Sequence, residues 1–218
     1  MSKKVAVILS GSGVFDGAEL HESVLCLLAL DRIGAEVTVL APNKDQAHVI
    51  NHQAGAPVDG ATRNVIEESA RIARGAVTAL DAASADDFDA VLMPGGFGAA
   101  KNLCTWAFDG AGCSVDADVE RFLRAVHAQG KWIGACCIAP VILAKLFGDE
   151  GIEVTIGSGD VEHAEVEKTG AKHIKMGVHG VHRDDERRVL STPAYMEAQR
   201  IADLPTGINE LVRQLINA

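Results

Sequence analysis

Apolar residues follow two different rhythms along the chain. Short apolar stretches rich in Val, Ile and Leu, typical of strands, alternate with longer segments in which apolar residues recur every three or four positions, as in amphipathic helices. We expect strands at residues 4–10, 35–42, 77–80, 89–93, 131–136 and 152–158. We expect helices at residues 22–33, 62–74, 114–130, 138–147 and 161–170, with a last helix from about residue 193 to residue 218.

This order of elements predicts a doubly wound α/β fold. Strands that alternate with helices of this length form parallel βαβ units, whose helices cover both faces of the sheet. The runs VAVIL, DAVLM and KWIGA lack alternating polar residues, as expected for strands that are buried on both faces. Two extended pieces flank DDE within residues 178–193, which predicts a β-hairpin. We expect a single domain over residues 1–218, with residues 43–62 as an insertion over the sheet.

Polar residues mark the expected starts of two helices. Thr62 is the expected N-cap of the helix at residues 62–74, because its hydroxyl can accept a hydrogen bond from a free backbone N–H group. Ser114 is the expected start of the helix at residues 114–130, where Asp116 and Asp118 would lie near the positive end of the helix dipole.

Composition and charge narrow the class of protein. The chain has 218 residues with 20 basic and 30 acidic side chains, a formal net charge of −10, which disfavours nucleic acid or an anionic membrane as a partner. No apolar run approaches the ~20 residues that span a bilayer, and VAVIL is too short for an export segment. The five cysteines include no CxxC pair, so a zinc ribbon is not expected. We expect a soluble protein of a reducing, cytoplasmic compartment.

Two adjacent thiols lie where the strand at residues 131–136 meets the next helix, in the run WIGACCIAPVI. Cys136 belongs to the strand and is expected in the core. Cys137 would occupy the turn, one residue before Ile138 opens the helix, and a helix N-terminus lowers the pKa of a thiol and favours thiolate at neutral pH. Free cysteine is also a common core residue. From the residues alone, Cys137 is therefore either a nucleophile or a buried packing residue.

Glycine-rich turns follow two other strands. The run PGGFG after residues 89–93 can direct backbone N–H groups into a cleft, although a plain turn has the same composition. The run GSGVFDG after the first strand lacks the spacing of a dinucleotide fingerprint, because the helix begins only near Glu22. His179 and His182 would face opposite sides of a strand, so they do not form a metal pair.

A set of longer motifs carries a family resemblance over nearly the whole chain. The segments LSGSGVFDGAELHES, NHQAG, TRN, MPGGFGAAKN, CCIAPVILAK, VTIGS and TPAYM resemble the ElbB family, also called glyoxalase ElbB or enhancing lycopene biosynthesis protein. This family is a PfpI-type branch of the class I glutamine amidotransferase-like superfamily. The resemblance implies a flavodoxin-like three-layer sandwich, with a mostly parallel sheet, helices on both faces and a nucleophile elbow. It also implies a homodimer.

The same resemblance assigns roles to four residues. Cys137 matches the elbow cysteine, and Glu22, rather than Glu19, matches the carboxylate beside it. A carboxyl in such a pocket should have a raised pKa, because burial and a neighbouring negative charge both disfavour ionisation. The backbone N–H groups of Gly96 and Ile138 would form an oxyanion hole.

One position departs from the wider superfamily. Many members carry a histidine about twenty residues after the elbow cysteine, where this chain has Gly157 in VTIGS. The departure removes the expected cysteine–histidine dyad and argues against hydrolase, protease or amidotransferase activity. His21 and His52 could approach the pocket, but neither receives a role.

Two functional hypotheses remain. The first is a lyase: a glyoxalase without cofactor or metal that converts glyoxal, or another small 2-oxoaldehyde, to a 2-hydroxy acid such as glycolate through the Cys137 thiolate. Apparent deglycase activity would follow, because removal of free glyoxal pulls reversible adducts apart. The alternative is a redox- or stress-responsive or regulatory protein linked to isoprenoid biosynthesis, whose reactive thiol turns over little substrate.

Overall fold

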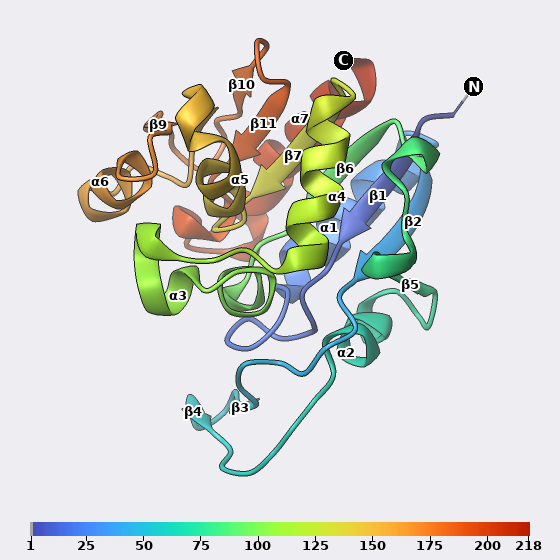
Figure 1. Cartoon of the computed structure of the whole chain (residues 1–218), viewed down its shortest axis with the longest axis vertical. Helices are drawn as coiled ribbons and strands as arrows, with labels where there is room; N and C mark the ends of the chain where they lie inside the picture. Colours follow the sequence, from blue (N-terminus) through green and yellow to red (C-terminus); the bar gives the residue numbers. More distant parts are fainter. Residues whose placement is uncertain (1) are drawn as a thin grey trace.

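The computed structural model describes residues 2–218 and is built around one seven-stranded sheet (Figure 1). The strands of this sheet are β1 (Lys4–Ile8), β2 (Glu36–Ala41), β5 (Val77–Ala79), β6 (Ala90–Met93), β7 (Trp132–Cys136), β10 (His182–Asp184) and β11 (Val189–Thr192). Their order is β10-β11-β7-β6-β1-β2-β5. All neighbouring strands are parallel except β10 and β11, which form the antiparallel hairpin that the sequence predicts.

Helices cover both faces of the sheet, so the predicted three-layer, flavodoxin-like sandwich is confirmed. The long helices are α1 (Leu20–Arg32), α2 (Val65–Ile72), α4 (Ala117–Ala128), α5 (Pro140–Phe147), α6 (Asp160–Glu167) and α7 (Leu204–Asn217). Helices α4 and α5 contribute to one buried cluster, and α1 and α7 contribute to the other. Figure 1 shows α4 in front of the sheet and α1 behind it.

Strand β1 illustrates why these residues form a sheet between two layers. Val5 and Val7 enter the cluster on the α1 side, whereas Ala6 and Ile8 enter the cluster on the α4 side. All four side chains are fully buried. A strand with four successive apolar residues can bury all of them only in the middle of such a sandwich.

Two helices begin later than the sequence suggests, because a different side chain caps them. Helix α2 starts at Val65 rather than at Thr62, since Oδ1 of Asn64 accepts hydrogen bonds from the N–H groups of Ile66 and Glu67, at 2.9 and 3.4 Å. An acceptor directly before the first turn satisfies donors that would otherwise be free.

The same correction applies to α4. This helix starts at Ala117, three residues after Ser114, because Oδ1 of Asp116 accepts from the N–H groups of Asp118 and Val119. Asp116 therefore acts as the N-cap itself rather than as an acidic residue inside the first turn.

Three further segments differ from expectation. Residues 152–158 do not join the main sheet: β8 (Glu153–Val154) pairs with β9 (Lys172–His173), because the β10–β11 hairpin already occupies the edge beside β7. The last helix begins at Leu204 rather than near residue 193, since residues 193–203 form two short 3-10 turns, Ala194–Met196 and Ile201–Asp203.

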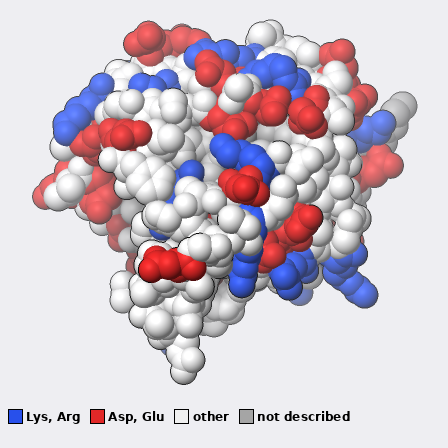
Figure 2. Space-filling model, turned by 60° about the horizontal axis from the view of Figure 1, so that its bottom comes forward, with Lys and Arg blue, Asp and Glu red and all other residues white. Residues whose placement is uncertain are grey.

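The third segment is the insertion that includes β3 (Ile50–Asn51) and β4 (Ala56–Pro57). It projects away from the sheet instead of lying over it (Figure 1), and Figure 2 shows it as a protrusion of mostly uncharged residues. Its base is fastened where the N–H group of Ile50 donates to the Asp16 carboxylate at 2.6 Å.

Replacement of the α2 cap provides a direct test of this helix start. We expect Asn64→Ala to lower the free energy of unfolding by about 1 kcal/mol, because two N–H donors of the first turn lose their acceptor. Thr62→Ala, at an exposed residue two positions earlier, should leave stability nearly unchanged. Urea unfolding followed by circular dichroism measures both variants. Equal losses in the two would contradict Asn64 as the cap.

Candidate active site

The loops at the carboxyl ends of β1, β6 and β7 converge on one pocket. In the strand order, β1 leads to β2 on one side while β6 and β7 lie on the other, so the pocket sits where the winding of the sheet reverses. Ligands of open α/β sheets bind at such switch points. Each of the three loops contributes one of the groups described below.

Cys137 occupies the turn between β7 and α5, with a backbone φ of 60°. This left-handed conformation is uncommon for a residue with a side chain and costs about 1–3 kcal/mol. Its N–H group donates to the carbonyl oxygen of Thr192 in β11 at 2.9 Å, which helps to hold the turn. The residue is 7% exposed, and that exposure opens into a cavity.

Cys136, the neighbouring thiol, is fully buried at the end of β7, within the core, as the sequence predicts. It contacts Cys26 of α1 rather than the cavity, and this contact, together with burial, raises the pKa of Cys136.

Glu22 lies in the first turn of α1 and is fully buried beside the Cys137 sulfur. Its Oε2 accepts from the N–H group of Gly95 at 3.0 Å and its Oε1 from the N–H group of Tyr195 at 3.1 Å, while a side-chain hydrogen bond joins it to Cys137. Burial, and to a lesser degree the charge of Glu19, raises the pKa of Glu22 to about 7. The carboxyl can therefore gain or lose a proton at neutral pH.

The environment of the Cys137 thiol differs from the one that the sequence suggested. Burial and the neighbouring Glu22 carboxylate raise the pKa of Cys137 well above its ordinary value, so the expectation of a thiolate favoured at neutral pH is wrong. Helix α5 begins only at Pro140, three residues after the thiol, and the N-terminal field falls off within about one turn. Burial and the negative charge of Glu22 therefore raise the pKa of Cys137 by more than this field lowers it.

Two backbone donors partly offset this rise and lower the pKa of Cys137. The N–H groups of Gly96 and Ile138 hydrogen-bond to the Cys137 sulfur and favour its anionic form. The structure thus brings together all four residues that the sequence nominated, Cys137, Glu22, Gly96 and Ile138, around one sulfur atom.

Glycine is required where the β6 loop passes this sulfur. A Cβ atom on Gly95 would lie 2.4 Å from the Cβ of Cys137, and one on Gly96 would lie 2.3 Å from the backbone nitrogen of Glu19. Gly96 also has a φ of +96°. Any side chain here would force the loop away from the thiol, so the two glycines allow the close approach of their N–H groups.

Glu19, which the sequence analysis left aside, is the N-cap of α1. Its Oε2 accepts from the N–H group of Glu22 at 2.7 Å, and its side chain lines the cavity. The signal was present in the sequence, because an oxygen-bearing residue three positions before a glutamate is the pattern of a helix N-cap and its third residue.

The cavity in front of Cys137 has a volume of about 490 Å³. Helix α3 (Trp106–Asp109), helix α6 and the 3-10 turn after β11 form its outer walls. Sequence reasoning assigned no role to the residues of these walls that line the cavity, including Trp106, Glu162 and Tyr195. TPAYM, which contains Tyr195, carried part of the resemblance, but nothing in its pattern indicates contact with Glu22.

The two histidines near the pocket lie outside its lining. Nδ1 of His21 is 2.7 Å from the hydroxyl of Tyr195, and Nε2 of His52 accepts from the N–H group of Phe15 at 3.3 Å. Gly157 occupies the position at which a histidine was expected from the wider superfamily. Its φ is +128°, and an added Cβ would lie 2.7 Å from Oε1 of Glu197. The space for a histidine side chain is occupied.

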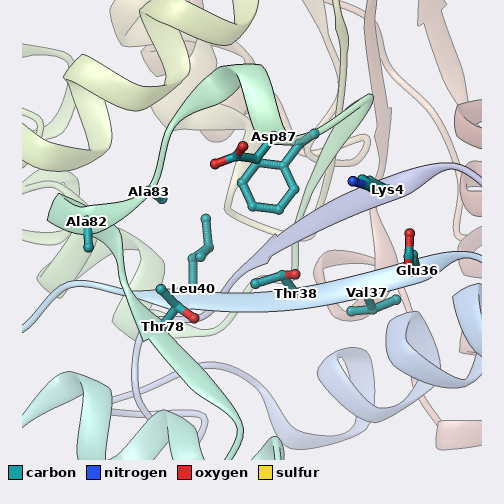
Figure 3. Close-up of a pocket in the computed structure, with 10 residues that line it drawn as sticks. Lys4, Glu36, Val37, Thr38, Leu40, Thr78, Ala82, Ala83 and Asp87 are labelled. Atoms are coloured by element: carbon teal, nitrogen blue, oxygen red, sulfur yellow. The ribbon is translucent and has the colours of Figure 1, made fainter.

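Elsewhere in residues 2–218 the structure offers little further chemistry. A second cavity of about 560 Å³ lies beside strands β1, β2 and β5 (Figure 3), but the residues that line it, among them Lys4, Thr38 and Asp87, include neither a thiol nor an imidazole. No group of three His, Cys, Asp or Glu side chains in this range could hold a metal ion. None of the described helices has both the length and the apolar composition to cross a membrane.

Curated relatives resemble the chain over most of its length. The human protein named glutamine amidotransferase-like class 1 domain-containing protein 3, mitochondrial, is 46% identical over 222 residues, which cover 98% of this chain and 82% of the relative. The zebrafish (Danio rerio) protein named ES1 protein, mitochondrial, is 34% identical over 208 residues, covering 88% of this chain and 76% of the relative.

These relatives contradict the expected cytoplasmic location. The human and zebrafish proteins and the ES1 protein homolog of Rattus norvegicus, which is 45% identical, all bear mitochondrial names. The expectation depended on free thiols and on the lack of an export segment. Free thiols persist in any reducing compartment, so these features did not distinguish the cytoplasm from an organelle.

Solved structures share the fold. The crystal structure of an isoprenoid biosynthesis protein with an amidotransferase-like domain from Ehrlichia chaffeensis superposes with a TM-score of 0.90 at 34% identity, covering 98% of this chain and 99% of that one. Drosophila melanogaster DJ-1beta gives 0.59 at 19% identity, covering 100% and 92%, and at that identity shows the fold alone.

A family model described as DJ-1/PfpI family matches residues 3–185, a span that includes the Cys137 turn, Glu22 and the glycine loop. The match covers most of the chain and agrees with the sheet order and with the relatives. The chain therefore belongs to the DJ-1/PfpI family.

Proposed function

We propose that the protein is a cofactor-free glyoxalase of the ElbB type, which converts glyoxal or a related 2-oxoaldehyde to a 2-hydroxy acid. The observation that carries this proposal is the contact of the buried Glu22 carboxyl with the Cys137 sulfur, with the N–H groups of Gly96 and Ile138 at the same atom. A nucleophile, a base and two anion-stabilising donors are the groups that such chemistry needs.

The reaction would begin with a proton transfer inside the site. The ionised Glu22 carboxylate takes the thiol proton of Cys137 while the sulfur attacks one aldehyde carbon. Glu22 then gives this proton to the former carbonyl oxygen, which yields a hemithioacetal and leaves Glu22 ionised again. This order suits a thiol of raised pKa, because the base removes the proton as the carbon–sulfur bond forms rather than beforehand.

The remaining steps move hydrogen from one carbon to the next. Glu22 takes the proton from the hemithioacetal carbon and returns a proton to the neighbouring carbonyl carbon through an enediol, which leaves a 2-hydroxy thioester on Cys137. Water then cleaves the thioester, releases glycolate and restores the thiol. The overall change is glyoxal plus water to glycolic acid, with no external oxidant or reductant.

A regulatory role linked to isoprenoid biosynthesis is the second candidate. It is supported by the similarity to the Ehrlichia chaffeensis protein, which is described as an isoprenoid biosynthesis protein. Its oxidation-sensor form has less support, because redox-sensing thiols are exposed and of low pKa, whereas Cys137 is buried with a raised pKa.

Substitution of each thiol separates the two cysteines. We expect Cys137→Ser to abolish glyoxal consumption, because a hydroxyl is a much weaker acid and nucleophile than a thiol, and Glu22 cannot take its proton. Cys136→Ser should keep activity and lose some stability, since it places a hydroxyl in the core beside Cys26. Steady-state glyoxal loss and thermal unfolding measure the two effects. Full turnover by Cys137→Ser would rule out the thiol mechanism.

Removal of the base tests the role of Glu22. Glu22→Gln keeps size and hydrogen-bonding capacity but cannot accept a proton, so we expect kcat to fall by ~100- to 10,000-fold. Parent activity should rise with pH through about 7, because the ionised carboxylate is the active form and its pKa is raised to about 7. A Glu22→Gln variant with parental turnover would favour the regulatory candidate.

Glu19→Gln is the matched control for the pH profile. The negative charge of Glu19 raises the pKa of Glu22, so its removal should lower that pKa and extend activity to lower pH. The amide oxygen can still cap α1, so the maximal rate should change little. An unshifted midpoint would show that the profile reports another group.

We also propose that the protein forms a homodimer through α1. Leu20, Val24 and Leu28 recur every four residues on this helix and are 45, 53 and 39% exposed, which forms an apolar stripe on the surface. Light scattering should return about twice the 22.9 kDa chain mass, and Val24→Asp should reduce it to the monomer. A monomeric parent protein at micromolar concentration would remove the proposal.

A further inference from the structure

We propose that the cavity in front of Cys137 selects carbonyl compounds that carry an apolar body of aromatic size and no negative charge. The inference rests on the proposed function for the reacting carbonyl, and on the cavity itself for the rest of the ligand. It predicts that glyoxal occupies only a small part of the space that the site offers.

The cavity is larger than glyoxal requires. The cavity measures about 490 Å³, within the range of roughly 300–1,000 Å³ that typically encloses a drug-sized ligand. Glyoxal is a two-carbon dialdehyde and would leave most of this space to water. A ligand that displaces this water from apolar walls gains binding free energy in proportion to the apolar area that it covers.

The walls of the cavity carry large apolar side chains. Phe97, Trp106 and Met196 line the cavity, and Phe97 is 49% exposed. Large aromatic side chains that remain open to water at a pocket mouth are typical of sites that stack on a flat apolar group. The flexible thioether of Met196 can adapt to its outline.

The charged side chains that line the cavity are acidic. Glu19, Glu162 and Glu165 line the cavity, whereas no lysine or arginine is among its lining residues. Lys101 lies nearby, but its ammonium group donates to the carbonyl oxygen of Phe15 at 2.9 Å and lies 5.2 Å from the ring centroid of Phe97. Glu165 is paired with Lys168, but the carboxylates of Glu19 and Glu162 have no lysine or arginine beside them in the lining, so 2-oxo acids should be excluded.

The same charges act on the product. Each turnover converts a neutral aldehyde into a hydroxy acid, which is ionised at neutral pH. The carboxylates of α6 repel this anion after the thioester is cleaved, and so favour its release over rebinding. Selection against anions and release of product therefore have one electrostatic origin.

Alkylation of Cys137 by three probes tests the cavity without relying on turnover. The probes are iodoacetamide, its N-phenyl derivative and iodoacetate, with the rate at Cys137 followed by peptide mass spectrometry and divided by the rate with free N-acetylcysteine. We expect the N-phenyl probe to react about tenfold faster than iodoacetamide, and iodoacetate about tenfold slower. Equal normalised rates would overturn the proposal.

Matched variants assign the two preferences to the walls. Trp106→Ala should remove the advantage of the N-phenyl probe, whereas Phe108→Ala, on the same helix but outside the lining, should keep it. Glu162→Gln should speed iodoacetate, whereas Glu167→Gln, also on α6 and outside the lining, should not. Equal effects of a wall variant and its control would contradict that part of the proposal.

Turnover separates this proposal from the one on which it rests. Phenylglyoxal should have a kcat/KM about tenfold above that of glyoxal in the parent protein. If no 2-oxoaldehyde is consumed while the alkylation preferences hold, the glyoxalase function fails and the ligand class stands. If glyoxal is consumed while the three probes show no preference, the ligand class fails and the glyoxalase function stands.

Discussion

The contact between a buried carboxyl and a buried thiol constrains the structure around the pocket. Glu22 lies beside Cys137 without access to solvent, and an isolated charge at such a depth is costly. The protein meets this cost with backbone donors: the N–H groups of Gly95 and Tyr195 bind the carboxyl, and those of Gly96 and Ile138 bind the sulfur. Three loops, those after β6, β7 and β11, must therefore present N–H groups around this pair of side chains.

This requirement explains the unusual backbone of the site. The β6 loop can pass the sulfur only if it carries no side chains, which makes Gly95 and Gly96 obligatory. Cys137 adopts a left-handed φ of 60°, and its strain is held by the hydrogen bond to Thr192 on the neighbouring strand. The parallel pairing of β7 with β11 thus does more than extend the sheet, because it fixes the angle at which the thiol leaves the strand.

The sequence predicts the parts of this arrangement that depend on local pattern. The doubly buried strands, the hairpin at β10–β11 and the turn that carries Cys137 follow from apolar runs and small residues. The pKa of Cys137 could not be predicted in the same way, because it depends on burial and on Glu22, which is 115 residues earlier in the chain. Trp106 was missed for a related reason: only the tertiary fold brings α3 over the elbow.

In the proposed reaction, proton transfer falls to a carboxylate, because this chain has Gly157 where a histidine was expected. Gly157 has a φ of +128°, and Glu197 fills the space beside it while accepting hydrogen bonds from the N–H and hydroxyl groups of Ser158. An imidazole there would need both a strained backbone and the displacement of Glu197. For the proposed reaction Glu22 needs a pKa near neutrality, and burial supplies most of that shift while the charge of Glu19 adds to it. Glu19 therefore caps the start of α1, and its negative charge also raises the pKa of Glu22, the carboxyl that faces the Cys137 sulfur.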